Sequence, residues 1–214
     1  MQIIVVRHGQ TEENAKRILM GHTPGKLSKL GIRQAKALAL KLKSMKIDLI
    51  ISSDLKRASD TTAEIIRYHK VPVVYTSELR EQNYGVFSGR PLKELLDAEI
   101  ANGVKAVDFR PARGESFADV KRRIAKFMKK LSRQYKNSTI LISAHAGIAQ
   151  SLMSIYMGIP LDEMLKTNPK NTGFLILELS GGKIKFINYW KKLFYEFCCA
   201  YRLGAVQVFF ILFL

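Results

Sequence analysis

Short apolar runs of strand length alternate with helix-like segments along this chain, and this alternation restricts the fold more than any other feature. The apolar runs lie at residues 3–6, 49–51, 71–75, 140–142, 174–179 and 184–190. Segments with helical spacing lie between them, at residues 28–45, 54–69, 116–135 and 147–157. Nearly continuous apolar strands that alternate with helices are typical of a parallel sheet covered on both faces. The sequence therefore predicts an α/β fold, a three-layer α/β/α sandwich with a mainly parallel sheet.

Turn, helix-cap and periodicity signals add detail to this prediction. Ser180-Gly181-Gly182 separates the last two apolar runs and is typical of a β-hairpin, so we expect an antiparallel edge strand. Ser28 is a suitable N-cap for the first long helix. The clearest helix is 116–135, where apolar side chains recur at i, i+4, i+7, i+8, i+11 and i+15. These side chains are Val120, Ile124, Phe127, Met128, Leu131 and Tyr135.

The 214 residues suit one domain with an appendage. No repeat or linker precedes residue 190, so we expect one domain over 1–190 and an apolar tail of unknown role over 191–214. As a helix, the last 22 residues would span about 33 Å, roughly a bilayer core. Glu196 and Arg202 would then lie in the membrane at a cost of about 3 kcal/mol each. Two hypotheses for the tail therefore stay open: a segment that associates with membranes, and a segment translated after a frameshift or read-through. A membrane anchor is not the favoured interpretation.

The remaining signals of location favour the cytoplasm. The only cysteines, the adjacent Cys198 and Cys199, offer neither a disulfide framework nor the spacing of metal ligands. The N-terminal apolar run is too short for a signal peptide and has no basic segment before it. We therefore expect a reducing, cytoplasmic location, and the sequence leaves a homodimer open.

The charge balance attracts anions without choosing among them. Lys and Arg number 35 against 18 Asp and Glu, which gives a formal net charge of +17. Residues 121–136 alone carry eight Lys and Arg on the polar side of the predicted helix. A solvated helix face explains them, and a basic protein that binds nucleic acid or an anionic surface is the alternative from another class. Nucleic acid is not an expected partner, because no aromatic residues stand among the charges on the polar side of this helix and no nucleic-acid-binding motif is present.

Chemically competent side chains follow four of the predicted strands. Arg7 and His8 follow the first, Arg57 the second, Glu81 the third and His145 the fourth. The carboxyl ends of parallel strands meet at one edge of a sheet, so these groups should converge. Arginine recognises phosphate oxygens in a planar fork, a neutral imidazole is a nucleophile, and a carboxyl group can protonate a leaving oxygen. This set is equipped for phosphoryl transfer.

Six ordered motifs contain these residues and carry a family resemblance. They are RHGQTEEN at 7–14, GHTPGKLSKLGIRQA at 21–35, SSDLKRASDTTA at 52–63, LREQNYGVFSGR at 79–90, RGES at 113–116 and SAHAGI at 143–148. In these motifs the chain resembles the histidine phosphatase superfamily, which includes cofactor-dependent phosphoglycerate mutases and many phosphomonoesterases. The resemblance covers about residues 1–190 and implies a phosphoglycerate mutase-like fold.

The resemblance also implies a role for each catalytic candidate. His8 would be the nucleophile and would become a phosphohistidine. Arg7, Arg57 and a protonated His145 would surround the phosphoryl group and supply the positive charge that a metal ion would otherwise bring. Glu81 would protonate the leaving alkoxide and later deprotonate the attacking water.

A second set would bind the substrate. Asn14 would add a side-chain donor, and the main chain of Ala146 and Gly147 would add a backbone donor at a helix start. Thr11, Gly21 and Tyr84 complete the predicted substrate-binding set. His22 and Lys26 border the same pocket in sequence, and contact with substrate stays open for both.

No metal or other cofactor is expected, because the sequence lacks HExxH, Walker A, EF-hand and Cys/His motifs. Glu81 must be protonated near neutral pH, above its ordinary pKa of about 4.3. A bound phosphate dianion would raise that pKa and the neighbouring arginines would lower it, so the balance stays open.

The segment after the catalytic Glu separates the two enzyme classes of the family. Mutase-type members carry a long insertion there, whereas only residues 82–114 intervene here. The sequence thus predicts a metal-independent phosphomonoesterase that acts through a phosphohistidine on a small phosphorylated metabolite. Phosphoglycerate mutase-type phosphotransfer is the alternative, and the identity of the phosphate ester stays open.

Overall fold

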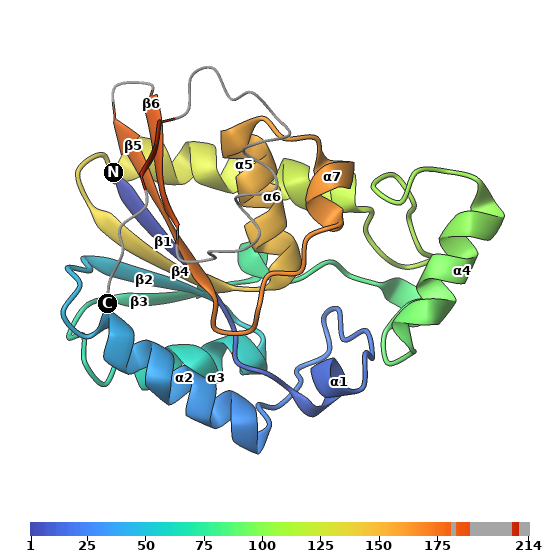
Figure 1. Cartoon of the computed structure of the whole chain (residues 1–214), viewed down its shortest axis with the longest axis horizontal. Helices are drawn as coiled ribbons and strands as arrows, with labels where there is room; N and C mark the ends of the chain where they lie inside the picture. The colour runs from blue at the N-terminus through green and yellow to red at the C-terminus, as the bar shows by residue number, and fades with distance from the viewer. Residues whose placement is uncertain (181–182, 189–206, 210–214) are drawn as a thin grey trace.

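A computed structural model describes residues 1–180, 183–188 and 207–209 of the chain, and it is built around one twisted sheet (Figure 1). The strand order is β3-β2-β4-β1-β5-β6-β7. The strands are β1 (Gln2–Arg7), β2 (Leu49–Ser53), β3 (Val73–Thr76), β4 (Thr139–Ala144), β5 (Phe174–Ser180), β6 (Lys183–Asn188) and β7 (Gln207–Phe209). The α-helices are α1 (Glu12–Ala15), α2 (Lys29–Leu42), α3 (Lys56–Ile65), α4 (Leu92–Asn102), α5 (Phe117–Gln134), α6 (Ala146–Met157) and α7 (Leu161–Leu165). Two 3-10 turns, η1 (Ser77–Leu79) and η2 (Gly85–Phe87), lie between β3 and α4.

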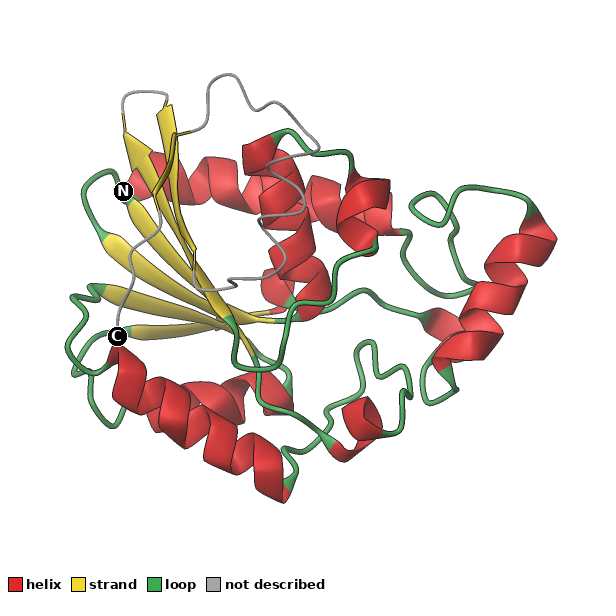
Figure 2. Cartoon of the chain, in the orientation of Figure 1, coloured by secondary structure: helices red, strands yellow, loops and turns green. Residues whose placement is uncertain are grey.

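The sheet is mixed and mainly parallel, as the sequence predicts. The pairs β1–β4, β4–β2 and β2–β3 are parallel, whereas β5 is antiparallel to both β1 and β6. The β5–β6 hairpin therefore lies on one side of the parallel strands, and β7 pairs in parallel with β6 beyond it. The fold class is confirmed, with helices on the two faces of the sheet (Figure 2).

The first strand shows why its sequence is apolar at every position. Ile3 and Val5 pack into the core formed with α5 and α6, whereas Ile4 and Val6 pack into the core formed with α2. All four side chains are buried, because successive residues of a strand point to opposite faces. Two covered faces therefore produce the continuous apolar run and the three layers.

The caps of the long helices follow the predicted signals. Ser28 accepts from the N–H of Gly31 at 3.0 Å and begins α2. Ser116 and Asp119 form a reciprocal capping box that begins α5. The apolar positions predicted along α5 are buried against the sheet, with the exception of Tyr135, which is partly buried at its C-cap. The helix that carries the RGES motif at its start is therefore fixed at that end.

The sequence patterns missed the arm that holds α4, which projects from the sandwich (Figure 1). Leu95 is the one buried residue of this helix, and it packs with Leu19 and Phe109 in a small separate cluster. Because α4 contacts this cluster instead of the sheet, it lacks the apolar stripe of a core helix.

Most of the predicted tail, residues 191–214, lies outside the described residues. Gln207–Phe209 is the part of it that the structure describes, as β7. In the described ranges, no helix has both the length and the apolar character needed to cross a membrane.

Candidate active site

Most of the predicted site residues meet at an open cleft of about 570 Å³ beyond the carboxyl ends of the parallel strands. A cleft of this size is in the range that holds small molecules. The predicted residues that line it are Arg7, His8, Asn14, Gly21, Arg57, Glu81, Tyr84 and Ala146. Sequence segments more than 130 residues apart thus contribute to one site, as expected for the carboxyl edge of a parallel sheet.

His8 is held in the tautomer that a nucleophile requires. It follows β1 directly, is 2% exposed, and places Nδ1 2.7 Å from the carbonyl oxygen of Gly9. Because a carbonyl can only accept, Nδ1 carries the proton and Nε2 keeps its lone pair. Burial lowers the pKa of His8 well below 6.5, and the charges of Arg57 and Arg7 lower it further. The imidazole is therefore neutral at neutral pH.

Arg57 is a buried cation at the first turn of α3. Its side chain is 1% exposed, and its Nη atoms donate to the carbonyl oxygens of Thr23 at 2.6 Å and Gly21 at 2.8 Å. Burial lowers the pKa of Arg57 to about 10, so the group is still charged at neutral pH. The loop that contains Gly21 therefore serves to hold this guanidinium.

Arg7 gives the site a second cation of the same kind. It donates from Nη1 to the carbonyl oxygen of Pro169, and burial lowers its pKa while the charge of Glu81 raises it. Within the described residues, neither Arg7 nor Arg57 forms an ion pair, and the Nε of each is buried without a hydrogen-bond partner. Buried charges are costly unless they are paired, so these two groups suit a bound anion.

His145 lies beside His8 at the N-cap of α6, where it is fully buried and is not among the residues that line the cleft. Its ring centroid is 5.2 Å from that of His8, with the ring planes at 61°. Nε2 lies 2.8 Å from the Oγ of Ser53, and Nδ1 has no partner in the part of the chain described. Burial lowers the pKa of His145 well below 6.5, with the charge of Arg57 as the next cause. The ligand-free site thus favours a neutral His145, in contrast to the protonated form expected from the resemblance.

Glu81 is seated on the start of α6. Its Oε1 accepts from the N–H of Gln82 at 3.0 Å, and its Oε2 accepts from the N–H of Gly147 at 3.3 Å. His22 reaches the same segment, with Nε2 2.9 Å from the carbonyl oxygen of Glu81. His22 therefore supports the backbone of Glu81, while Lys26 is not among the residues that line the cleft.

Two residues predicted to bind substrate lie behind the cleft instead of in its lining. Gly147 directs its N–H to Glu81, as described above. Thr11 is fully buried, and its Oγ1 accepts from the N–H of Asn14 at 3.1 Å to cap α1. Both residues position the groups that do line the site. The sequence spacing alone could not distinguish a ligand contact from this supporting role.

Asn14 itself faces the cleft, and its support comes from a residue that the motifs missed. The Nδ2 of Asn171 donates to the carbonyl oxygen of His8 at 3.1 Å and to the Oδ1 of Asn14 at 3.3 Å. Since Oδ1 is occupied in this way, the amide N–H groups of Asn14 are the part left for a ligand. Asn171 lies in the loop before β5. That strand runs antiparallel to β1, so the loop returns to the site, and the predicted hairpin direction could have indicated it.

Tyr84 is a further predicted residue of the cleft lining. Burial raises the pKa of its hydroxyl, and the charge of Glu81 raises it further, so the hydroxyl stays protonated. Tyr84 is also close to Gly21, where a Cβ would lie 3.0 Å from the Tyr84 N. Gly21 has φ +51°, a conformation that favours glycine, so this residue shapes the turn that accepts from Arg57.

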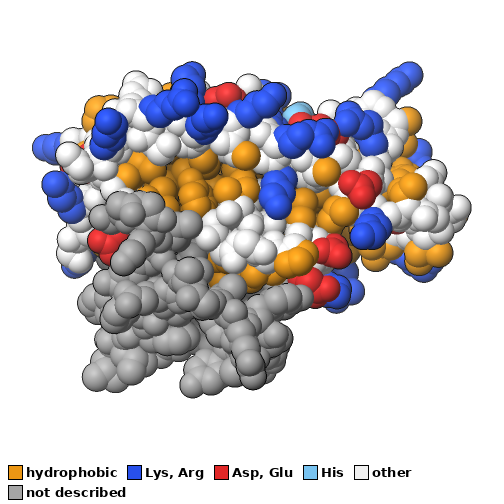
Figure 3. Space-filling model, turned by 90° about the horizontal axis from the view of Figure 1, so that it is seen from above, with side chains coloured by type: hydrophobic (Ala, Val, Ile, Leu, Met, Phe, Trp, Pro, Cys, Tyr) orange, Lys and Arg blue, Asp and Glu red, His pale blue; other side chains and the backbone are white. Residues whose placement is uncertain are grey.

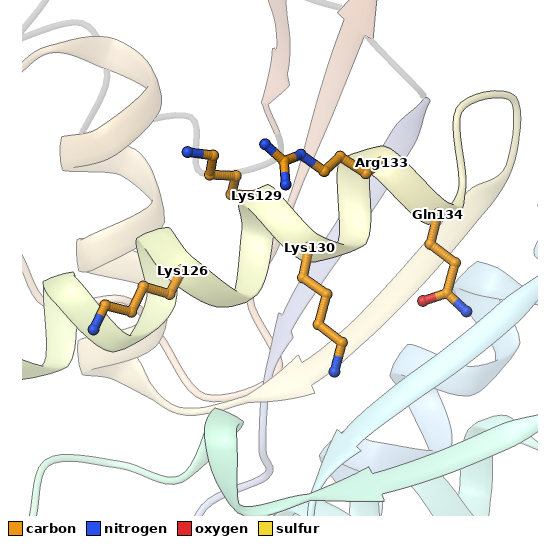
Figure 4. A pocket seen from close by; sticks show the side chains of 5 residues that line it. All are labelled: Lys126, Lys129, Lys130, Arg133 and Gln134. Carbon is orange, nitrogen blue, oxygen red and sulfur yellow. The ribbon is translucent and has the colours of Figure 1, made fainter.

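The predicted basic helix divides into structural and solvated residues. Arg123 pairs with Glu115 of the RGES motif at 3.1 Å and donates to the carbonyl oxygens of Glu78 and Arg80, so it ties α5 to the segment before Glu81. Lys121 donates to Ser154 at 2.9 Å. Farther along α5, a shallow surface depression is lined by Lys126, Lys129, Lys130, Arg133 and Gln134, whose side chains spread apart (Figure 4). Lys and Arg outnumber acidic side chains over the face seen in Figure 3 as well.

The described residues contain no group of three or more His, Cys, Asp or Glu side chains that could hold a metal ion. The polar groups that line the cleft include the imidazole of His8, guanidiniums, amides and one carboxylate. They can bind a phosphate group, attack its phosphorus atom and exchange a proton with the leaving oxygen.

Comparison with known proteins gives an independent view of the same residues. The family described as the histidine phosphatase superfamily (branch 1) matches residues 3–191. The chain is 29% identical over 168 residues to the adenosylcobalamin/alpha-ribazole phosphatase of Escherichia coli, which covers 77% of this chain and 83% of that protein. It is 32% identical over 166 residues to a probable phosphoglycerate mutase of Yersinia pestis, with 75% and 76% covered.

A solved structure shows the same architecture. The crystal structure of the alpha-ribazole phosphatase from Shigella flexneri superposes with a TM-score of 0.76 at 28% identity. The match covers 86% of this chain and 93% of that one.

Proposed function

The chain is a phosphatase that belongs to the histidine phosphatase superfamily, and we propose that it hydrolyses small phosphate monoesters through a phosphohistidine formed at His8. The observation that carries this proposal is the state of His8, with Nδ1 bonded to the Gly9 carbonyl and a free Nε2 lone pair. The nucleophile lies beside a buried guanidinium, that of Arg57, and a partly buried one, that of Arg7, and neither has an ion-pair partner among the described residues.

In the first step, Nε2 of His8 attacks the phosphorus atom and the P–O bond to the leaving group breaks. The leaving oxygen takes a proton from the carboxyl group of Glu81, so an alcohol departs and the phosphoryl group stays on His8. Arg7 and Arg57 neutralise the non-bridging oxygens, and Asn14 adds an amide donor. His145, whose Nδ1 has no partner among the described residues, contributes a further donor.

In the second step, Glu81 takes a proton from a water molecule, whose oxygen attacks the phosphorus atom. The P–N bond to His8 breaks, inorganic phosphate forms, and Nε2 regains its lone pair. Gly147 and Gln82 keep the carboxylate in one place for both proton transfers through their N–H groups. A fixed position matters because proton transfer falls off steeply with misplacement.

The substrate class is a small phosphorylated metabolite. The cleft volume supports this size, and the relatives named for phosphatase activity support the chemistry. The catalytic unit is residues 1–190, which nearly coincide with the family match over 3–191. A cytoplasmic location rests on the adjacent cysteines Cys198 and Cys199 alone.

Mutase-type phosphotransfer is the second candidate, favoured by the 32% identity to a probable phosphoglycerate mutase. A mutase must exclude water from the phosphohistidine, whereas the cleft here is open and the 82–114 segment is short. These two features favour hydrolysis.

A panel of phosphorylated metabolites, assayed for inorganic phosphate and for isomerised product with and without a chelator, tests the proposal. We expect phosphate release that the chelator does not change. Isomerisation without phosphate release would identify a mutase, and loss of activity in the chelator would contradict the mechanism.

A further inference from the structure

Arg17 is the cation of the cleft that the phosphoryl chemistry does not use. It follows α1, lines the cleft and has an exposed side chain. In the described part of the chain it forms no ion pair, whereas the cleft-lining Lys166 pairs with Glu163 at 2.7 Å. Glu81 is the one acidic residue among the described residues of the lining.

The backbone of Arg17 is held in an unfavourable conformation. Its φ is +55°, which costs an arginine about 1–2 kcal/mol relative to the right-handed region. The surrounding structure fixes it there: its N–H donates to the carbonyl oxygen of Asn14 at 3.2 Å, and its own carbonyl oxygen accepts from Leu92 at 3.0 Å. Strained residues of this kind persist where the surrounding structure holds them, and they cluster at ligand sites.

These two hydrogen bonds also fix the backbone position from which the side chain of Arg17 extends. Asn14 lines the phosphate end of the cleft, and Arg17 starts one turn farther along the chain. On the other side, Leu92 begins α4 and borders the cleft with the apolar residues Ile18 and Leu19. Arg17 therefore adds a cation beside these apolar residues of the lining, and we place it next to the position from which a leaving group would extend from the phosphate.

We propose that Arg17 is a specificity-determining residue that binds a second anionic group, such as a carboxylate, on the leaving-group side of the substrate. This inference rests on the proposed phosphatase function. An anion there gains the attraction of a guanidinium in a cleft that Arg7 and Arg57 also make positive, and Glu81 is the one carboxylate among the described residues of the lining. A neutral leaving group would gain none of this attraction.

A ladder of phosphorylated hydroxy acids of two to six carbons, each compared with its neutral primary amide, tests the proposal. For at least one chain length, the wild type should prefer the acid over the amide by about fivefold or more in kcat/KM, chiefly through KM. Arg17→Met keeps the length of the side chain without the charge and should remove the preference, whereas Arg17→Lys should restore part of it. Lys16→Met is the matched control, because it removes a neighbouring exposed charge outside the cleft lining.

The outcomes separate this inference from the proposed function. A preference below about fivefold at every length, or one that survives in Arg17→Met, would overturn the role of Arg17. Equal loss in Lys16→Met would reduce the effect to general charge and overturn it as well. If neither the acids, the amides nor p-nitrophenyl phosphate is hydrolysed by the wild type, the proposed function itself fails.

Discussion

The backbone N–H of Gly147 donates to Oε2 of Glu81, and a Cβ on Gly147 would lie 2.4 Å from Oε1 of the same carboxylate. A contact that short cannot persist, so the carboxylate must move if residue 147 carries a side chain. The start of α6 thus supports the carboxylate of Glu81, the proposed proton donor, and also sets its distance from Gly147.

Gly147→Ala should therefore lower kcat by about 10- to 100-fold, since a displaced proton donor loses its alignment with the leaving oxygen. Steady-state kinetics on p-nitrophenyl phosphate measure the change. Gly103→Ala is the control, because Gly103 has φ +70° with open space around it, and this variant should lose stability without losing activity. Wild-type kcat in Gly147→Ala would contradict the proposed part played by Glu81.

Arg57→Met should lower kcat/KM by about 100- to 1000-fold, the usual effect of removing one donor to a developing charge. It should also abolish the rise in Tm that inorganic phosphate gives the wild type, because the bound anion loses its buried cation. Differential scanning fluorimetry with increasing phosphate measures this. Lys56→Met, next in the chain and paired on the surface with Asp60, should keep the full shift. A shift in Arg57→Met equal to that of the wild type would contradict a phosphate site there.

Stability should fall as the pH drops below about 6.5, because burial lowers the pKa of both His8 and His145 in the folded state. Below 6.5 the unfolded chain binds protons that the folded chain does not, so acid favours unfolding, and above 6.5 this contribution is fully present. Urea unfolding at pH 5, 6 and 7 should show a smaller dependence in a His8→Gln/His145→Gln variant. An equal dependence in the two proteins would contradict the neutral state of these imidazoles.

Arg123→Met should destabilise the protein by about 1–3 kcal/mol, because it leaves Glu115 and two backbone carbonyls without their donor. Lys129→Met, from the solvated part of the same helix, should stay within about 0.5 kcal/mol of the wild type. Urea unfolding of both variants distinguishes a helix face with one structural arginine from a uniformly solvated one. Equal stability of the two variants would contradict this division.

The solvated part of α5 gives a test of the binding alternative. Replacing Lys126, Lys129, Lys130 and Arg133 with Gln should leave phosphatase kinetics unchanged and weaken retention on heparin. Any nucleic-acid binding by the wild type should disappear at moderate salt, as expected of nonspecific charge. Affinity that persists at about 200 mM salt would favour a built binding surface instead.

The sequence predicted the three layers because hydrophobic periodicity distinguishes strands from helices. It predicted the main site because the candidate residues directly follow the strands. Alternating burial of Ile3, Ile4 and Val5 follows from a strand covered on both faces, and His8 follows from where that strand ends. Asn171 was not predicted, because no local sequence pattern marks it. It reaches His8 because β5, which follows its loop, runs antiparallel to β1.

The dependence on three-dimensional packing also explains where the site differs from the sequence-based prediction. Thr11 and Gly147 stand in motifs that resemble ligand contacts, and three-dimensional packing decides whether their polar groups face the cleft or a neighbouring side chain. The helix α4 escaped because it packs on a small cluster with Leu19 and Phe109, apart from the sheet. Burial also lowers the pKa of His145, whereas the resemblance implies a protonated ring, and burial is a property of the folded chain.

The central claim is that turnover passes through a phosphohistidine at His8. Rapid acid-free quenching of the enzyme with ³²P-labelled substrate, followed by tests of label stability and peptide mapping, measures this directly. We expect label that is stable in base, labile in acid, located on the peptide that contains His8, and absent from His8→Ala. Full hydrolytic turnover by His8→Ala, or label on another residue, would contradict the account.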